Sequence, residues 1–332
     1  MTERVHHSLL VIDTHVDIPW PNGADFLTDG PRCVDLPKLR RGGVGAVCFA
    51  AYVPQGKRDA SGDAEARARA LGMLDTIAHM GAEEGTVLAR DADAIEQAHL
   101  AGRIAVIPAV ENGTALGGDL ASLDDFAARG VRYMTLTHNG HNALADSAIP
   151  RRDLGDAEAE HGGLSALGRA AIGRMNDLGI LADVSHAAKS TMMQAAVLSR
   201  TPIVATHSCA RALCDHPRNL DDEQLIALRD TGGVIQITMV SAFLKPGAKP
   251  SDVGVFTVAD HVDYVAERIG IDHVGIGTDF DGGGGVDGYM HAGQTPALTA
   301  ELVSRGYDGA ALGKIWGGNF LRVLRAAEAA RK

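Results

Sequence analysis

Three ionisable side chains stand on alternate positions at the end of an apolar run. The sequence LLVIDTHVDIPW (9–20) places Asp13, His15 and Asp17 two residues apart. In an extended strand, residues i, i+2 and i+4 point to one face, and converging buried ionisable groups need a partner. A metal ion is one such partner. An exposed strand end with solvated acids is the alternative interpretation of this segment alone.

Side chains of the same kinds end other apolar runs, at Glu111, His138, His186, His207 and Asp279. Their shared placement favours one common site over several unrelated surface residues. Imidazole and carboxylate donors together suit zinc or a similar borderline divalent ion, whereas an all-oxygen set would indicate magnesium or calcium. The donors exceed the needs of one tetrahedral ion. Two zinc ions bridged by a carboxylate would use them economically and would generate a hydroxide for hydrolysis.

Nine of the other ten histidines do not follow this pattern, and the tenth, His273, begins the last apolar run. Five of them fall in helix-like segments or polar loops: His6, His7, His79, His99 and His161. Four others are expected at the surface, in loops or helices: His141, His216, His261 and His291. His141 stands close enough to His138 in the sequence to reach a substrate, but exposure is the favoured interpretation.

Eight apolar runs would form the strands that position these groups. The runs cover 9–13, 45–53, 104–111, 131–138, 179–186, 202–207, 232–239 and 273–279. The helix-like segments cover 62–82, 92–101, 121–129, 164–178, 187–198, 221–229, 257–269 and 309–330. Apolar strands that alternate with helices indicate a parallel sheet covered by helices. Eight repeats favour a closed (β/α)8 TIM barrel with its active site at the carboxyl ends of the strands; a doubly wound sheet is the alternative.

No linker rich in Pro or Ser divides the chain, so we expect a single domain over 1–332 that ends in a helical segment at about 296–330. The GGGG segment at 282–285 and the polar segment 139–163 are expected to be loops after strands, where barrel enzymes carry their sites. Segment 139–163 is interpreted either as a lid or rim of the site or as a solvated surface loop.

Composition excludes several classes of partner. The formal net charge is −11 and no basic run occurs, which argues against a nucleic-acid backbone. We expect no secretory signal at the start, no hydrophobic anchor at the end and no membrane span. The four cysteines are too few and too scattered for a disulfide framework, and none forms a C-x-x-C pair. These features together predict a cytoplasmic protein.

Six segments extend from the first run to about residue 285: IDTHVDIPW, AVENG, YMTLTHN, DVSH, ATHS with HPRN, and GTDFDG. In order and approximate spacing they resemble the membrane (renal) dipeptidase family of zinc metallopeptidases. The resemblance implies a (β/α)8 barrel with two zinc ions per chain. It also implies hydrolysis of dipeptides, with tolerance of a D-residue on the carboxyl side, and it suggests a homodimer because family members are often dimers.

The resemblance also implies roles for individual residues. His15 and Asp17 match ligands of the first zinc ion, Glu111 matches the carboxylate that bridges both ions, and His186 and His207 match ligands of the second. The other matches concern the substrate. His138 matches the histidine that contacts it and stabilises the tetrahedral intermediate, Arg218 the arginine that holds its carboxylate, and Asp279 the acid that shuttles the proton.

Chemistry alone leaves Arg211 as a competitor to Arg218, and spacing from the last metal histidine favours Arg218. Asp13, one step deeper than His15, is expected to orient a ligand or a backbone group of the first strand. The loop NGHNALAD after His138 departs from the family pattern, so the resemblance does not predict the geometry of the rim or the side-chain preference of the site. Two alternative functions are a metal-dependent cyclic amidase or deaminase and a non-peptidase protein on the same barrel.

Overall fold

The computed structural model describes residues 2–18 and 25–332. The described residues do not include 19–24, which contain Pro19 and Trp20 of the opening segment and the start of the loop that follows it. The sheet contains β1 (Val11–Asp17), β2 (Val44–Tyr52), β3 (Thr86–Leu88), β4 (Ile104–Glu111), β5 (Tyr133–Thr135), β6 (Leu181–Asp183), β7 (Val204–Ser208), β8 (Val234–Ile237) and β9 (Val274–Ile276).

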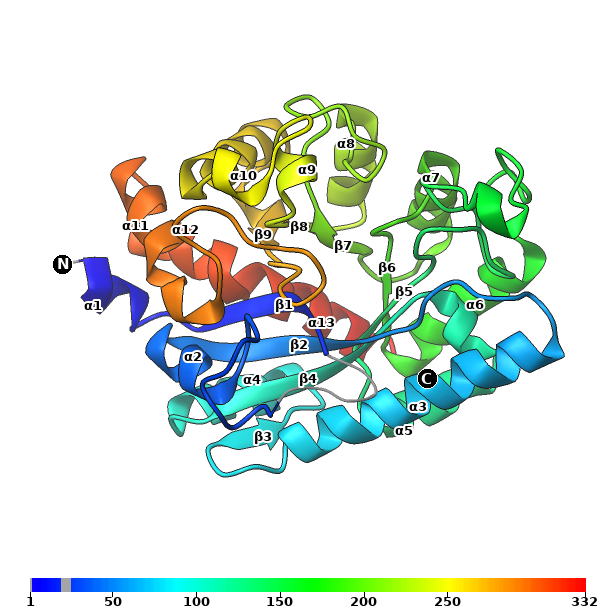
Figure 1. Ribbon diagram of the computed structural model, residues 1–332, viewed down its shortest axis with the longest axis horizontal. Coiled ribbons are helices and arrows are strands. Elements are labelled where there is room, and N and C mark those ends of the chain that lie inside the picture. The colour runs from blue at the N-terminus through cyan, green and yellow to red at the C-terminus, as the bar shows by residue number, and fades with distance from the viewer. Residues whose placement is uncertain (1, 19–24) are drawn as a thin grey trace.

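Helices alternate with the strands and cover the outside of the sheet (Figure 1). They are α1 (Thr2–His6), α2 (Leu36–Arg41), α3 (Ala60–Met80), α4 (Ala92–Leu100), α5 (Ser122–Ala128), α6 (Ala166–Leu178), α7 (Lys189–Leu198), α8 (Asp222–Asp230), α9 (Ser241–Leu244), α10 (Val255–Ile269), α11 (Pro296–Ser304), α12 (Gly309–Gly313) and α13 (Asn319–Ala329). A π-helical turn (Lys314–Gly318) joins α12 to α13, and several short 3₁₀ turns occupy the loops.

The strands pair in parallel in the order β1-β2-β4-β5-β6-β7-β8-β9. The ends of this order meet, because Val16 forms a parallel bridge with Phe280 just beyond β9. Two backbone hydrogen bonds of 3.0 Å close the seam, from Asp17 N to the Phe280 carbonyl and from Asp279 N to the His15 carbonyl. The predicted (β/α)8 barrel is therefore confirmed, and the doubly wound alternative is wrong.

The short strand β3 was not among the predicted runs. It pairs with the start of β4, through Thr86 and Ile104, while β5 pairs with the end of β4, through Thr135 and Glu111. Two of its three residues are only partly buried, so the segment lacks the continuous apolar run that marks the other strands. Strands β5 and β6 are shorter than predicted, which leaves His138 and His186 three residues beyond their strand ends.

Apolar packing lies on both sides of the sheet. One cluster fills the space between strands and outer helices. A second cluster joins strand residues such as Ile12, Ile107 and Val204 to Phe320 and Leu324 of α13, which contacts β6, β8 and β9. The C-terminal helical segment thus contributes directly to the core of the barrel.

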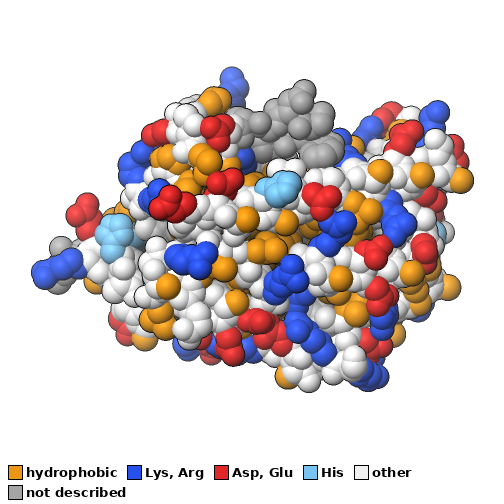
Figure 2. All heavy atoms as spheres, turned by 90° about the horizontal axis from the view of Figure 1, so that it is seen from below, with side chains coloured by type: hydrophobic (Ala, Val, Ile, Leu, Met, Phe, Trp, Pro, Cys, Tyr) orange, Lys and Arg blue, Asp and Glu red, His pale blue; other side chains and the backbone are white. Residues whose placement is uncertain are grey.

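The surface and the cysteines agree with the composition. Figure 2 shows Lys and Arg interspersed with Asp and Glu on the face seen from below in Figure 1, so the described residues there form no basic field. Within the described part of the chain, no helix combines the length and the apolar character that crossing a membrane requires. All four cysteines are free, as predicted.

Candidate metal centre

The predicted site residues meet at the carboxyl ends of the strands, which is where barrel folds gather functional side chains. His15 and Asp17 lie on β1, Glu111 ends β4, and His207 lies on β7. The others follow strands, with His138 after β5, His186 after β6, Arg218 after β7 and Asp279 after β9. The structure thus brings together every side chain that the sequence analysis assigned to the site.

Glu111 is the centre of the cluster and is only 2% exposed. One of its carboxylate oxygens lies 3.5 Å from His15 Nε2. The other lies 3.1 Å from His186 Nε2, 3.4 Å from His207 Nε2 and 3.9 Å from His138 Nε2. Because the two oxygens face different imidazoles, the carboxylate has the arrangement that a bridge between two cations requires.

The donor atoms around Glu111 fit a metal centre. Three buried atoms have no hydrogen-bond partner among the described residues: His15 Nε2, Asp17 Oδ1 and His207 Nε2. Buried polar atoms are normally satisfied, so these atoms point to a missing partner. Their nitrogen and oxygen chemistry suits zinc or a similar ion.

The described residues contain two overlapping groups of three donors, and within each group the ligand atoms lie within 4.8 Å of one another. They are His15, Glu111 and His207, and Glu111, His138 and His186. This grouping by distance differs from the family pattern, which pairs His207 with His186 and assigns His138 to the substrate. Both groups share Glu111.

Burial and mutual charge set the protonation of the cluster. Burial by itself would raise the pKa of Glu111, but the imidazoles around it, His15 first, bring that pKa well below its usual value. Burial lowers the pKa of His138 to about 4 and that of His207 to about 3. At neutral pH these two rings are therefore neutral, which is the form that can bind a metal or donate one hydrogen bond.

Backbone strain is concentrated at this site. The non-glycine residues with positive φ are Asn112 (86°), His186 (65°), Asp279 (60°) and Asp281 (63°), among the described residues. Such conformations are uncommon outside glycine and gather at functional sites. The loop after β9 also needs Gly282, because a Cβ there would lie 2.4 Å from Asp279 Oδ1 and 2.6 Å from Asp17 Oδ2. The absence of a side chain at Gly282 in the GGGG segment therefore lets the backbone pass close to both carboxylates.

Asp13 makes the kind of contact that the sequence predicted. Its carboxylate is buried and accepts hydrogen bonds from His15 N (3.3 Å), Thr278 N (3.0 Å) and Thr278 Oγ1 (2.6 Å). Asp13 therefore orients the backbone of β1 and fixes the segment that carries Asp279.

A cavity of about 210 Å³ opens onto the cluster. Its wall contains Arg218, whose Nη2 donates to the His207 carbonyl at 3.1 Å and whose guanidinium lies 5.2 Å from the Phe243 ring centroid. Asn139, Val240 and Phe243 also line this cavity, and the sequence analysis named none of the three as an individual site residue. Asn139 begins segment 139–163, for which a rim of the site was one interpretation. Val240 and Phe243 follow a strand with no polar terminus, so only their place in a loop after a strand put them near the site.

Two predictions about histidines are wrong. His141 is fully buried, because its backbone N–H donates to Asp156, its Nδ1 accepts from Ser147 N, and its Nε2 contacts the Ala157 carbonyl. His261 is also fully buried, between Ala210 N and the Leu244 carbonyl. Each ring forms hydrogen bonds with backbone groups of two other segments inside the protein, and the local sequence does not reveal such contacts. His216 and His291, also expected at the surface, are partly buried.

The segment 139–163 is neither a free lid nor a solvated loop throughout. Residues 140–142 and 144–147 are buried, whereas 152–155 and 157–162 are exposed. The buried Asp146 carboxylate accepts backbone hydrogen bonds from Glu160, His161 and Gly163. The segment therefore forms a fixed rim beside the site with an exposed outer tip.

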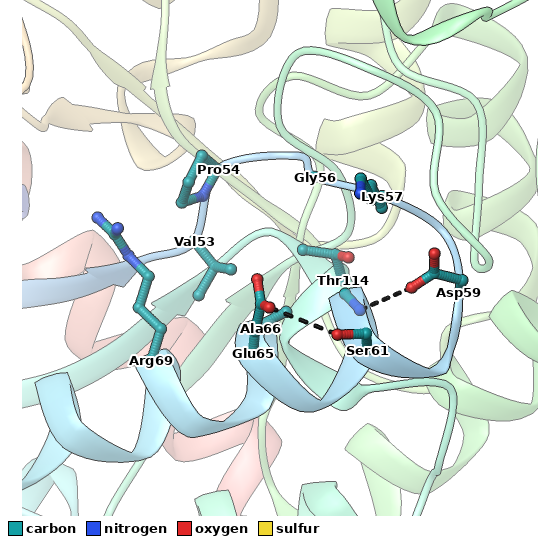
Figure 3. Close-up of a pocket in the computed structure, with 11 residues that line it drawn as sticks. Val53, Pro54, Gly56, Lys57, Asp59, Ser61, Glu65, Ala66, Arg69 and Thr114 are labelled. Atoms are coloured by element: carbon teal, nitrogen blue, oxygen red, sulfur yellow. Dashed lines mark hydrogen bonds between the residues drawn. The ribbon is translucent and has the colours of Figure 1, made fainter.

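A second cavity, of about 340 Å³, lies beside the start of α3 (Figure 3). The loop after β2 and Thr114 form its other walls, and it contains none of the predicted site residues. Its charged lining is mixed, with Lys57 and Arg69 against Asp59 and Glu65. This cavity lacks the converging donors that distinguish the metal centre.

Comparison with known proteins agrees with this geometry. The family model of the membrane dipeptidases (peptidase family M19) matches residues 1–332. Dipeptidase verJ of Clonostachys rogersoniana is 33% identical over 342 aligned positions, which cover 96% of this chain and 84% of that protein.

Two solved structures are similar over nearly the whole chain. The probable dipeptidase PvdM of Pseudomonas aeruginosa has a TM-score of 0.94 and 31% identity, and the match covers 99% of this chain and 98% of that one. A metallo peptidase of Rhodobacter sphaeroides, liganded with a phosphinate mimic of the dipeptide L-Ala-D-Ala, has a TM-score of 0.83 and 27% identity, with 96% and 99% coverage. The chain therefore belongs to the membrane dipeptidase family, peptidase family M19.

Proposed function

We propose that this protein is a binuclear zinc dipeptidase that hydrolyses the peptide bond of dipeptides, both L-Xaa-L-Xaa and L-Xaa-D-Xaa. The observation that carries the proposal is Glu111, whose two oxygens face imidazoles of different strands. Family membership supports the reaction class. The dipeptide mimic on the Rhodobacter sphaeroides relative supports the substrate class.

In this proposal His15 and Asp17 hold one zinc ion, His186 and His207 hold the other, and Glu111 bridges them. When bound, the ions would supply the Lewis acidity that makes water nucleophilic near neutral pH and polarises the scissile carbonyl. The unpartnered atoms of His15, Asp17 and His207 support this assignment.

The remaining residues act on the substrate. Arg218 binds the free carboxylate of the dipeptide, because its planar guanidinium can donate two parallel hydrogen bonds. His138, neutral and 21% exposed at its side chain, donates a hydrogen bond to the carbonyl oxygen under attack. Asp279, whose side chain is 14% exposed, accepts the proton of the attacking water and returns it to the leaving amine.

The test of this function is a dipeptide panel combined with a metal count. Purified protein with added zinc should hydrolyse members of an L-Xaa-L-Xaa and L-Xaa-D-Xaa panel, and elemental analysis should give two zinc ions per chain. A cyclic amide such as a hydantoin should not be hydrolysed. Two bound zinc ions with no turnover of any dipeptide would refute the proposal, and turnover of the cyclic amide alone would favour the amidase alternative.

An Asp279→Asn variant separates a hydrolase from a barrel that only binds ligands. A hydrolase should lose turnover by about 10²-fold or more while it keeps both zinc ions, because only proton transfer is removed. A His138→Ala variant tests the division of the histidines. It should keep two zinc ions if His138 contacts the substrate, whereas loss of one ion would assign His138 to the metal.

A further inference from the structure

Two buried hydroxyl groups contact the histidines from the side that faces away from Glu111. His15 Nδ1 lies 2.9 Å from the Tyr133 hydroxyl, and His207 Nδ1 lies 3.0 Å from the Thr206 hydroxyl. We propose that Tyr133 and Thr206, the latter held by Asp183, are positioning residues that keep hydrogen on Nδ1 and a free lone pair on Nε2 of both rings. The inference rests on the proposed function, in which these Nε2 atoms bind zinc.

The Tyr133 hydroxyl has its only hydrogen committed elsewhere. Its oxygen donates to the Thr14 carbonyl at 3.0 Å. Because a hydroxyl has one donor hydrogen, the oxygen must accept from His15 Nδ1. In the neutral ring of His15, the lone pair therefore lies on Nε2, which faces Glu111 at 3.5 Å and Asp17 at 3.7 Å.

The Thr206 hydroxyl is committed in the same way, to Asp183. Thr206 Oγ1 donates to Asp183 Oδ2 at 2.7 Å, so its oxygen must accept from His207 Nδ1. The opposite direction would put the hydrogen of the neutral His207 ring on Nε2, where it would face the metal centre. The same Thr206 oxygen lies 3.4 Å from His15 Nδ1, so one hydroxyl contacts the outer nitrogens of both rings.

The Asp183 carboxylate accepts four hydrogen bonds, and one of them is from the Thr206 hydroxyl. Its Oδ2 also accepts from Thr135 Oγ1 at 2.6 Å, and its Oδ1 accepts from Ser185 N and Thr206 N, both at 3.0 Å. Four donors occupy the four lone-pair positions of the carboxylate. Asp183 is fully buried, so no bulk water competes for these positions.

A third ring has the same orientation. His186 Nδ1 lies 3.1 Å from Asn139 Oδ1, an oxygen that can only accept. Hydrogen bonds to the outer nitrogen of a metal-binding histidine fix its tautomer and ring plane, and their loss typically weakens metal affinity 10- to 100-fold. The ring planes and the hydrogens on Nδ1 would thus be set before any metal binds.

The test compares zinc affinity and histidine tautomers in matched variants. Thr206→Val removes the acceptor at nearly constant shape, Tyr133→Phe removes the acceptor for His15, and Thr206→Ser restores a hydroxyl. Thr135→Val is the control, because Thr135 also donates to Asp183 Oδ2 but forms no hydrogen bond with an imidazole. Zinc affinity is measured by competition with a chelator, and tautomers by long-range ¹H–¹⁵N spectra of protein labelled at histidine, with and without zinc.

We expect zinc affinity to fall about 10- to 100-fold in Thr206→Val and Tyr133→Phe, and to be kept in Thr206→Ser and Thr135→Val. The wild-type spectra should show hydrogen on Nδ1 of His207 both with and without zinc. Hydrogen on Nε2 of His207 in the metal-free protein, or an equal loss of affinity in Thr135→Val, would overturn the inference. A protein that shows these effects but hydrolyses no dipeptide would refute only the proposed function.

Discussion

At the scale of single residues, the site holds several carboxylates close together, and bound cations would offset the repulsion between them. Asp17, Glu111 and Asp279 all lie within 4.0 Å of His15 Nε2. Burial first, and then the charge of Glu111, raises the pKa of Asp17 to about 6. Burial together with Asp17 and Glu111 raises the pKa of Asp279 to about 8, although His15 opposes the shift. Metal ions favour the charged forms, so metal binding should release protons.

Asp279→Asn should therefore stabilise the metal-free protein increasingly as the pH rises. The folded pKa of Asp279 exceeds its ordinary value of 3.8, so the folded state keeps a proton that the unfolded chain has released. Titration of this carboxyl lowers the free energy of unfolding of the wild type between about pH 4 and pH 8, by no more than about 1.4 kcal/mol per pH unit. The asparagine variant lacks this decrease.

Urea denaturation of chelator-treated protein at several pH values measures the difference between variant and wild type. The difference should level off above about pH 8. Asp17→Asn is the matched comparison, and its difference should level off above about pH 6. A difference that does not change across this range would contradict the raised pKa of Asp279.

Arg218→Lys should weaken recognition of the substrate carboxylate. Arg218 is only 3% exposed, its guanidinium donates to the His207 carbonyl, and an ammonium cannot reproduce the planar fork of the guanidinium. We expect kcat/KM for a dipeptide to fall about 10-fold or more, while kcat/KM for the corresponding dipeptide amide changes little. Arg211→Lys is the control, since Arg211 pairs with the exposed Asp215. Equal losses on the acid and the amide would remove Arg218 from carboxylate binding.

At the scale of elements, the loops that follow the strands are held by buried side chains. Asp281 accepts backbone hydrogen bonds from Cys33 (2.8 Å) and Val34 (3.2 Å), which attaches the loop before α2 to the loop after β9. Asp146 has the same role within segment 139–163. These anchors give the rim of the site a fixed shape around the cavity.

Asp146→Ala should loosen the rim. Removal of the carboxylate leaves the buried N–H of Gly163 and the partly buried N–H groups of Glu160 and His161 without this acceptor, and we expect a loss of about 1–3 kcal/mol in the free energy of unfolding. Hydrogen exchange of Glu160, His161 and Gly163 should accelerate. Asp153→Ala, in the same segment but with a side chain that is 62% exposed, should stay within about 0.5 kcal/mol of wild type. Unchanged exchange in Asp146→Ala would show that other contacts hold the rim.

At the scale of the whole molecule, the site exists only because the barrel closes. The contact between β1 and the segment after β9 brings residues more than 260 positions apart to within hydrogen-bond distance, such as Asp13 and Thr278. Gly277 lies at this seam, where a Cβ would be 1.9 Å from the Thr206 carbonyl oxygen and 2.7 Å from Thr14 Oγ1.

Gly277→Ala should therefore destabilise the whole fold. The added methyl group meets the backbone carbonyl of Thr206 on β7, which cannot move without disturbing the packed strands, so we expect a loss of about 1–3 kcal/mol or more. Gly313→Ala is the control, because no atom of the described residues, apart from its chain neighbours and its own helix backbone, lies within 4 Å of the added Cβ. Urea denaturation measures both variants, and equal stability of the two would contradict a tightly closed seam.

The sequence by itself determined the eight strands of the barrel, the longer helices between them and the kinds of side chain that gather at the site. Apolar runs that alternate with helical segments specify a parallel sheet, and polar residues at their ends, from His15 to Asp279, specify a common rim. These signals are local, because each arises from residues a few positions apart. The same signals could not reveal β3, in which two of three residues are only partly buried, or the buried rings of His141 and His261.

Only the tertiary structure decided how the pieces meet. It alone determined that the sheet closes between Val16 and Phe280, that Phe243 forms a wall of the cavity, and that hydroxyl groups contact the outer nitrogens of the histidines. The physical reason is range. A hydrogen bond between His15 and Tyr133 joins residues 118 positions apart, and its existence depends on the packing of every strand between them.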